Sequence, residues 1–283
     1  MAEILKGMDV ANAMKEGLIA ENAALLAKGV TPCLAIVRVG ERPDDLAYER
    51  GALKRFEGIG VATRVSAFPE DIAQSEFETE FKKINDDAGV HGILLFRPLP
   101  KHLDEGAILE IIDPAKDMDG MCDTNIAKVF AGDESGYAPC TPEGVIELLK
   151  HFEVPLKGAK VTLVGRSMVV GKPLAMLLLK EHATVTICHT RTVDLAAECR
   201  AADILIAAAG AAKMIGAEHV KEGTVVIDVG INVDEEGNLC GDVDFDAVEP
   251  LASKITPVPG GVGSVTTSIL AKHTLKAAAV VIK

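Results

Sequence analysis

Short apolar runs alternate along the chain with longer stretches in which apolar residues recur at helical spacing. The runs have the length and the content of buried strands, and they cover residues 32–40, 62–68, 92–98, 159–165, 184–189, 204–210 and 224–230. The stretches between and after them predict helices around 44–58, 74–86, 143–151, 172–181 and 266–281. Strands that alternate with helices are typical of βαβ units and parallel sheets, so the pattern predicts an α/β fold.

A further helix is predicted near the N-terminus, over residues 8–27. We expect its apolar positions to face a core; they are Met8, Val10, Met14, Leu18 and Leu25. The segment PCTPEG at 139–144 separates two α/β halves, and Thr141 is expected to cap a helix that begins at Pro142. Because 283 residues are many for one hydrophobic core, we expect two domains.

Composition and charge narrow the classes of partner. The formal net charge of −13 argues against non-specific binding to nucleic acid or to an anionic membrane. No apolar run approaches the ~18 residues that a membrane span needs, and the N-terminus has no signal-peptide pattern. The six cysteines form no C-x-x-C pair, which indicates reduced thiols and predicts neither a disulfide framework nor a metal site. We therefore expect a cytoplasmic protein.

A strand, a glycine turn and a helix follow one another over residues 159–179. The turn reads G-x-S-x-x-x-G, with Gly165, Ser167 and Gly171, which differs from the usual G-x-G-x-x-G. An ordinary βα turn would also place a glycine at 165. The order of strand, turn and helix favours a dinucleotide-binding turn of a Rossmann-type domain, because N–H groups at a helix start suit a pyrophosphate.

The tip of the next strand indicates which dinucleotide binds. NAD enzymes usually carry an acidic residue about 20 residues after the turn, where it holds the ribose hydroxyls. Here the strand ends in His189, Thr190 and Arg191, and Arg166 lies inside the turn. Hydroxyl and guanidinium groups without a carboxylate suit a 2′-phosphate, so the sequence favours NADP over NAD.

Four long motifs occur in one order along the chain: VGERPDDLAYERG (39–51), DPAKDMDG (113–120), VGRSMVVGKP (164–173) and ITPVPGGVGSVT (255–266). With PCTPEG and VIDVGIN (226–232), they resemble the methylenetetrahydrofolate dehydrogenase/cyclohydrolase (FolD) family over essentially the whole chain. The resemblance implies an α/β enzyme of two domains with an active-site cleft between them. Residues 1–141 and 267–283 would form the folate-binding catalytic domain, and residues 142–266 the Rossmann-type NADP domain.

The resemblance also implies a biological role and a set of site residues. The protein would be an oxidoreductase of one-carbon metabolism and purine biosynthesis, with a tetrahydrofolate one-carbon substrate and a homodimeric state. Tyr48 and Asp119 match the family's folate-binding and catalytic positions, and a carboxylate such as that of Asp119 can accept two donors from the edge of the pterin. The family's other substrate-binding positions match Pro259, Gly260 and Gly261. Its cofactor-binding positions match Thr141, Gly165, Arg166, Ser167, Thr190, Ile231 and Thr266.

Two of these segments have a plainer interpretation when the resemblance is set aside. KDMDG at 116–120 is then an acidic turn in solvent, and the glycines at 260–261 are a hinge before the last helix.

Two positions depart from the family, and both belong to its cyclohydrolase chemistry. The family's Y-x-x-x-K places a catalytic Lys where this chain has Ala52, and its V-Q-L-P-L-P places the Gln that binds this Lys where the chain has Phe96. Lys54 lies two residues further along the helix, on a different face. Ser264 and Val265 also replace a Pro-Met pair in the last loop, which is a milder change.

The two reactions make different demands on the protein. Oxidation of the methylene bridge moves one hydride and no proton, so positioning suffices, whereas hydrolysis of the methenyl cation needs a deprotonated water. The sequence therefore predicts NADP-dependent oxidation of 5,10-methylenetetrahydrofolate to 5,10-methenyltetrahydrofolate, with weak or absent cyclohydrolase activity. Two alternatives stay open: a fully bifunctional enzyme that uses Lys54 or a water as the base, and a folate- or nucleotide-binding protein without turnover.

Overall fold

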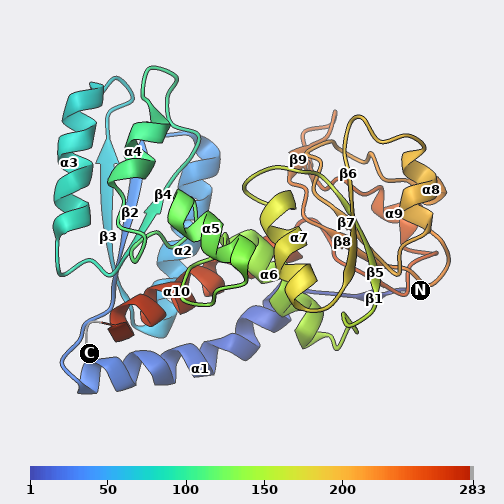
Figure 1. Cartoon of the computed structure of the whole chain (residues 1–283), viewed down its shortest axis with the longest axis horizontal. Coiled ribbons are helices and arrows are strands. Elements are labelled where there is room, and N and C mark those ends of the chain that lie inside the picture. Colours follow the sequence, from blue (N-terminus) through green and yellow to red (C-terminus); the bar gives the residue numbers. More distant parts are fainter. Residues whose placement is uncertain (281–283) are drawn as a thin grey trace. The chain divides into compact units, whose positions relative to one another are not determined.

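The computed structural model describes residues 1–280, which divide into two compact units (Figure 1). Unit 1 comprises Met1–Asn12 and Thr141–Thr266, and unit 2 comprises Ala13–Cys140 with residues 267–280. Both units are α/β, which confirms the predicted fold class. The predicted first domain began at residue 1, but the structure places Met1–Asn12 in unit 1. The reason is a parallel pairing of β1 (Glu3–Ile4) with β11 (Lys254–Ile255).

Unit 2 is built on a three-stranded parallel sheet in the order β3-β2-β4. Strand β2 (Cys33–Val39) and strand β4 (Gly92–Leu95) are almost entirely buried, whereas the edge strand β3 (Ala62–Phe68) has no buried residue. Both faces of β2 and β4 are covered, which explains why these two strands are continuous apolar runs in the sequence. The predicted strand 92–98 ends at Leu95, so Phe96 and Arg97 lie just beyond the sheet.

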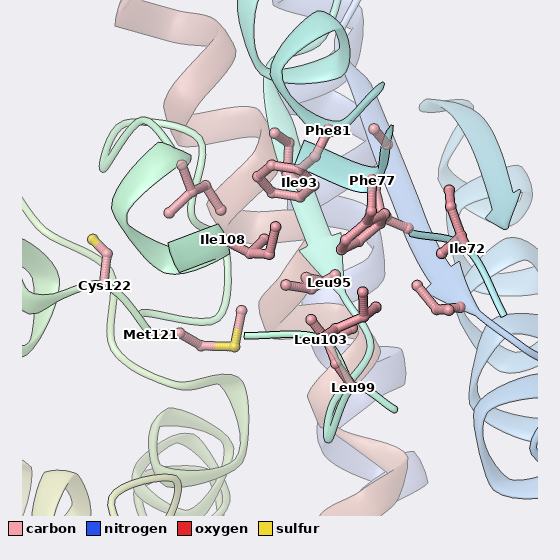
Figure 2. Close-up of a cluster of buried hydrophobic side chains, with 14 of the residues drawn as sticks. Ile72, Phe77, Phe81, Ile93, Leu95, Leu99, Leu103, Ile108, Met121 and Cys122 are labelled. Carbon is pink, nitrogen blue, oxygen red and sulfur yellow. The ribbon is translucent and has the colours of Figure 1, made fainter. Parts of the chain in front are cut away.

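Helices connect and cover the strands of unit 2. They are α2 (Pro43–Ile59), α3 (Gln74–Asp86), α4 (Glu105–Ile111) and α5 (Asp123–Ala131), with α10 (Thr266–Val280) and most of α1 (Gly7–Ala27). Figure 2 shows the core in which α3 and α4 meet the sheet. Phe77 and Phe81 of α3 join Ile93 and Leu95 of β4 and Ile108 of α4 there. This packing fixes the end of β4 and hence the start of the segment that carries Phe96.

Unit 1 is built on a six-stranded sheet in the order β1-β11-β8-β7-β5-β6, and every pairing in it is parallel. The inner strands are β5 (Lys160–Val164), β7 (Ile204–Ala207), β8 (Val225–Asp228) and the short β11, and β6 (Thr184–Cys188) is an edge strand. The strand order reverses between β5 and β7. In open α/β sheets, ligands bind beyond the carboxyl ends of the strands at such a reversal.

The remaining elements of unit 1 are short, apart from two helices. These two are α6 (Cys140–His151) and α7 (Gly171–Lys180). The short elements are α8 (Leu195–Arg200), α9 (Phe245–Val248), the hairpin strands β9 (Asn232–Val233) and β10 (Leu239–Cys240), and the 3-10 turns Ala217–His219 and Val262–Ser264. Within residues 1–280, every helix is too short or too polar to span a bilayer.

Every predicted helix is present, but two details differ from the prediction. Helix α6 begins at Cys140 and already contains Thr141, because the carboxylate of Asp119 accepts the N–H of Cys140 at 2.7 Å and takes the capping role. In α1, Val10, Leu18 and Leu25 are buried, whereas Met14 is half-buried and Met8 is 49% exposed. Position 281 of the last predicted helix lies outside the described residues.

Candidate functional site

The turn between β5 and α7 lies at the carboxyl edge of the six-stranded sheet. Gly165 has φ +134°, and a Cβ atom there would lie 2.1 Å from the carbonyl oxygen of Ala208, so a larger residue would displace the loop after β7. The Ser167 hydroxyl accepts the N–H groups of Val170 at 3.1 Å and Gly171 at 3.4 Å. Ser167 thus shapes the start of α7, where a helix attracts anions.

Two arginines lie near this turn without a carboxylate partner. Val164 of β5 is paired with Cys188 of β6, which places the turn at 165–167 beside the strand end at 189–191. Arg166 and Arg191 are exposed, and no carboxylate partner for either guanidinium is found among residues 1–280. Thr190 is exposed between His189 and Arg191. The arrangement offers two permanently charged guanidinium groups and a hydroxyl, which suits a phosphate group.

A pocket of about 250 Å³ lies at the same edge of this sheet. It is lined by residues 228–231, Leu239 and residues 257–264. The predicted site residues Ile231 and Pro259–Gly261 therefore meet in one pocket, although 25 or more residues separate them in the sequence. The side chain of Ile231 is 70% exposed, so it is available for contact with a ligand.

Thr266 stabilises the pocket loop by a hydrogen bond to its backbone. Its side chain is buried, and its hydroxyl donates to the carbonyl oxygen of Gly263 at 3.1 Å. At the other end of the loop, the N–H of Gly7 donates to the carbonyl oxygen of Gly260 at 2.9 Å. Thr141 is half-buried in the first turn of α6, away from the residues that line this pocket.

In unit 2, Tyr48 lies on α2 and contacts Phe96. The two rings meet edge to face, with centroids 5.8 Å apart and an interplanar angle of 87°. Ala52 lies one turn after Tyr48 on the same helix face and has no exposed surface. Ala52 therefore presents only a methyl group, and Phe96 an aromatic ring, at the positions where the resemblance places Lys and Gln. The neighbouring Arg97 is held by an ion pair with Glu105.

Asp119 is half-buried, and its carboxylate contacts Cys140 at the start of α6. Oδ1 accepts the N–H of Cys140 at 2.7 Å, and the Cys140 side chain also hydrogen-bonds this carboxylate. Burial raises the pKa of Asp119, against the lowering effect of the hydrogen bonds from Cys140. Asp117 is fully buried and accepts hydrogen bonds from the Cys122 N–H at 2.9 Å and Asn125 Nδ2 at 3.0 Å. The segment is thus a turn whose two carboxylates are held by hydrogen bonds, rather than an acidic turn in open solvent.

Two buried aspartates beside the pocket, Asp228 and Asp242, were not predicted from the sequence as site residues. Their position could have indicated them, because each lies at or just after the end of a short strand on the pocket side. Residues 1–280 contain no group of three or more His, Cys, Asp or Glu side chains that would hold a metal ion.

Comparison with known proteins also divides the chain into two parts, although the two ends of the chain are assigned differently. Residues 5–119 match the catalytic domain described as tetrahydrofolate dehydrogenase/cyclohydrolase, and residues 139–281 match the NAD(P)-binding domain of that family. The chain is 60% identical over 275 residues to the protein named Bifunctional protein FolD of Clostridioides difficile (strain 630), which covers 97% of this chain and 96% of that protein.

Solved structures agree with this assignment. The bifunctional enzyme FolD from Campylobacter jejuni has a TM-score of 0.95 at 42% identity and covers 99% of both chains. The methylenetetrahydrofolate dehydrogenase-cyclohydrolase of Trypanosoma brucei, solved with NADP cofactor and an inhibitor, has a TM-score of 0.93 at 36% identity, over 100% of this chain and 99% of that one.

Proposed function

Because the chain belongs to the tetrahydrofolate dehydrogenase/cyclohydrolase family, we propose that it oxidises 5,10-methylenetetrahydrofolate to 5,10-methenyltetrahydrofolate with NADP. The observation that carries the proposal is the carboxyl edge of the six-stranded sheet. There a Gly165 turn, two guanidinium groups without carboxylate partners and a pocket lined by Ile231 and Pro259–Gly261 occur together. The homodimer and the cytoplasmic location stay predictions from the sequence.

The residues of unit 1 fit the cofactor. Arg166, Arg191 and Thr190 would hold the 2′-phosphate, the start of α7 would face the pyrophosphate, and the pocket would take the nicotinamide. When bound, NADP supplies the hydride acceptor.

In unit 2, the Asp119 carboxylate would accept a donor of the pterin edge, and Tyr48 with Phe96 would offer an aromatic surface to its ring. No residue has to carry a proton in this reaction, so the protein's task is positioning.

We further propose that hydrolysis of the methenyl product is weak or absent. The support is chemical: Ala52 and Phe96 carry no group that takes up a proton, and Arg97 is paired with Glu105. The second candidate is a fully bifunctional enzyme. The name that relatives up to 60% identical carry favours it, and the exposed Lys54 of α2 is its candidate base.

Two assays on one sample separate these candidates. With NADP, we expect the absorbance of the methenyl product to rise, and to rise much less with NAD. In the second assay, the absorbance of added methenyl substrate is followed as it decays. Formation of product with rapid decay favours the bifunctional candidate. A well-folded protein that forms no product with either nucleotide contradicts the proposed reaction and favours a binding protein without turnover.

We expect Arg166→Ala to reduce the preference for NADP over NAD by about 10- to 100-fold, because a charge-assisted hydrogen bond to the 2′-phosphate is lost. The measurement is the ratio of kcat/KM for the two nucleotides. Arg200→Ala is the matched control, since Arg200 is an exposed arginine of the same unit at the far end of α8. A wild-type protein that already prefers NAD would show that the strand-end interpretation is wrong.

A further inference from the structure

Two buried carboxylates lie next to each other where β8 and the β9–β10 hairpin meet. Asp228 is 3% exposed and lines the pocket, and Asp242 has no exposed surface. Asp228 Oδ1 accepts the N–H groups of Gly230 at 2.9 Å and of Asp242 at 3.0 Å, and its Oδ2 accepts the N–H of Val243 at 2.9 Å. The side chain of Asp228 thus joins the end of its own strand to the end of the hairpin.

Asp242 joins two further segments. Its Oδ2 accepts the N–H groups of Ala209 at 2.6 Å and Gly210 at 3.0 Å, in the loop after β7. Its Oδ1 accepts the N–H of Ala211 at 2.8 Å and Nδ2 of Asn232 at 2.9 Å. Each oxygen therefore receives two donors, which a carboxylate can satisfy and a neutral amide cannot.

Two glycines allow the carboxylates to approach the backbone so closely. A Cβ atom on Gly241 would lie 1.8 Å from Asp228 Oδ2, and one on Gly230 would lie 2.4 Å from Asp242 Oδ1. Asp228 also binds the residue that follows β11, because its N–H donates to the Thr256 hydroxyl at 2.7 Å. Thr256 immediately precedes the 257–264 segment of the pocket, so both walls of the pocket are fixed to this pair.

Burial of the Asp228 carboxylate lowers the stability of the folded protein. Burial raises the pKa of Asp228 to about 6, against the effect of its backbone hydrogen bonds. The raised pKa means that the ionised form is disfavoured in the folded state, so this group's contribution to stability falls as the pH rises through about 6. A position needed only for packing is better served by a neutral side chain.

We propose that Asp228 and Asp242 are positioning residues for the nucleotide, and that they hold Ile231 and the 257–264 loop in the shape that receives its nicotinamide end. The inference rests on the proposed use of NADP. Neither carboxylate has to touch the reacting atoms, since both act through the backbone of the loops they bind.

The test compares Asp242→Asn and Asp228→Asn with wild type at pH 8, where Asp228 is ionised. NADP affinity is measured by calorimetry, and KM and kcat are measured for both substrates. In Asp242→Asn, the new amide group points a donor at other donors in either orientation, and we expect NADP to bind about 10- to 100-fold more weakly. Asp228→Asn loses only the acceptor for Val243, so we expect a smaller loss. In both variants the KM for NADP should rise together with its dissociation constant.

Asp203→Asn is the matched control. Asp203 also accepts a backbone N–H, from Lys160 at 3.0 Å, but it precedes β7 at the opposite edge of the sheet. If Asp242→Asn does not fold, Asn232→Ala takes its place, since it removes one donor to Asp242 and is expected to weaken NADP binding as well. Folded variants with unchanged NADP affinity, or an equal loss in Asp203→Asn, would overturn the positioning role. A wild-type protein that binds no NADP would instead overturn the proposed function and the inference with it.

Discussion

Hydrolysis of 5,10-methenyltetrahydrofolate by the wild-type protein is expected to run near the uncatalysed rate. Positioned acid–base groups typically contribute about 10²- to 10⁴-fold to such a step. Here Ala52 is fully buried and Phe96 carries an aromatic ring, at the two positions where the resemblance to the family places a catalytic Lys and its Gln partner. The measurement is the decay of methenyl absorbance with and without enzyme, corrected for the spontaneous reaction.

A pair of substitutions tests the cause of this loss. Ala52→Lys alone should gain little, because its ammonium group would lie in a buried site beside Phe96 without a hydrogen-bond partner. Ala52→Lys with Phe96→Gln should restore more hydrolysis than the two single changes together, because residues that act as a unit are non-additive. Dehydrogenase turnover and thermal unfolding serve as controls, since a buried Lys also lowers stability. Rapid wild-type hydrolysis that is abolished by Lys54→Ala would show that another base serves this site.

Asp119→Ala is expected to lower kcat/KM for the folate substrate by about 10- to 100-fold, because the pterin edge loses a charge-assisted hydrogen-bond acceptor. NADP binding should stay nearly unchanged, since Asp119 belongs to unit 2. The substitution also removes the acceptor for the Cys140 N–H at the start of α6, so part of any loss reflects the helix.

Two further variants separate these effects. Asp119→Asn keeps an oxygen for the Cys140 N–H but removes the charge, and it should lose nearly as much folate activity as Asp119→Ala. Asp113→Ala is the matched control: its exposed carboxylate lies in the same motif and accepts only the local N–H of Ala115 at 2.8 Å. Full folate activity in Asp119→Asn would assign Asp119 to the helix rather than to the substrate.

Local features of the sequence were sufficient for most of the regular structure. The apolar runs and the helical periodicity predicted β2, β5 and α3 to within a residue or so. Burial on both faces of a parallel strand gives a continuous apolar run, and burial on one face of a helix gives a helical period. The turn at Gly165 was predicted equally well. The two-residue strand β1 was not predicted, because its pairing with β11 joins residues about 250 positions apart and leaves no periodic pattern in the sequence.

For the candidate site, the motifs determined which residues are present, and the tertiary structure decided what each one meets. Parallel strands end at one edge of a sheet, so the grouping of Gly165, Arg166 and Thr190 followed from the parallel sheet and the two successive strands that the sequence predicted. The sequence did not reveal that Asp119 caps α6, that Glu105 holds Arg97, or that Asp228 and Asp242 share a network. Those contacts join loops whose paths depend on the packing of whole elements, and no spacing along the chain encodes them.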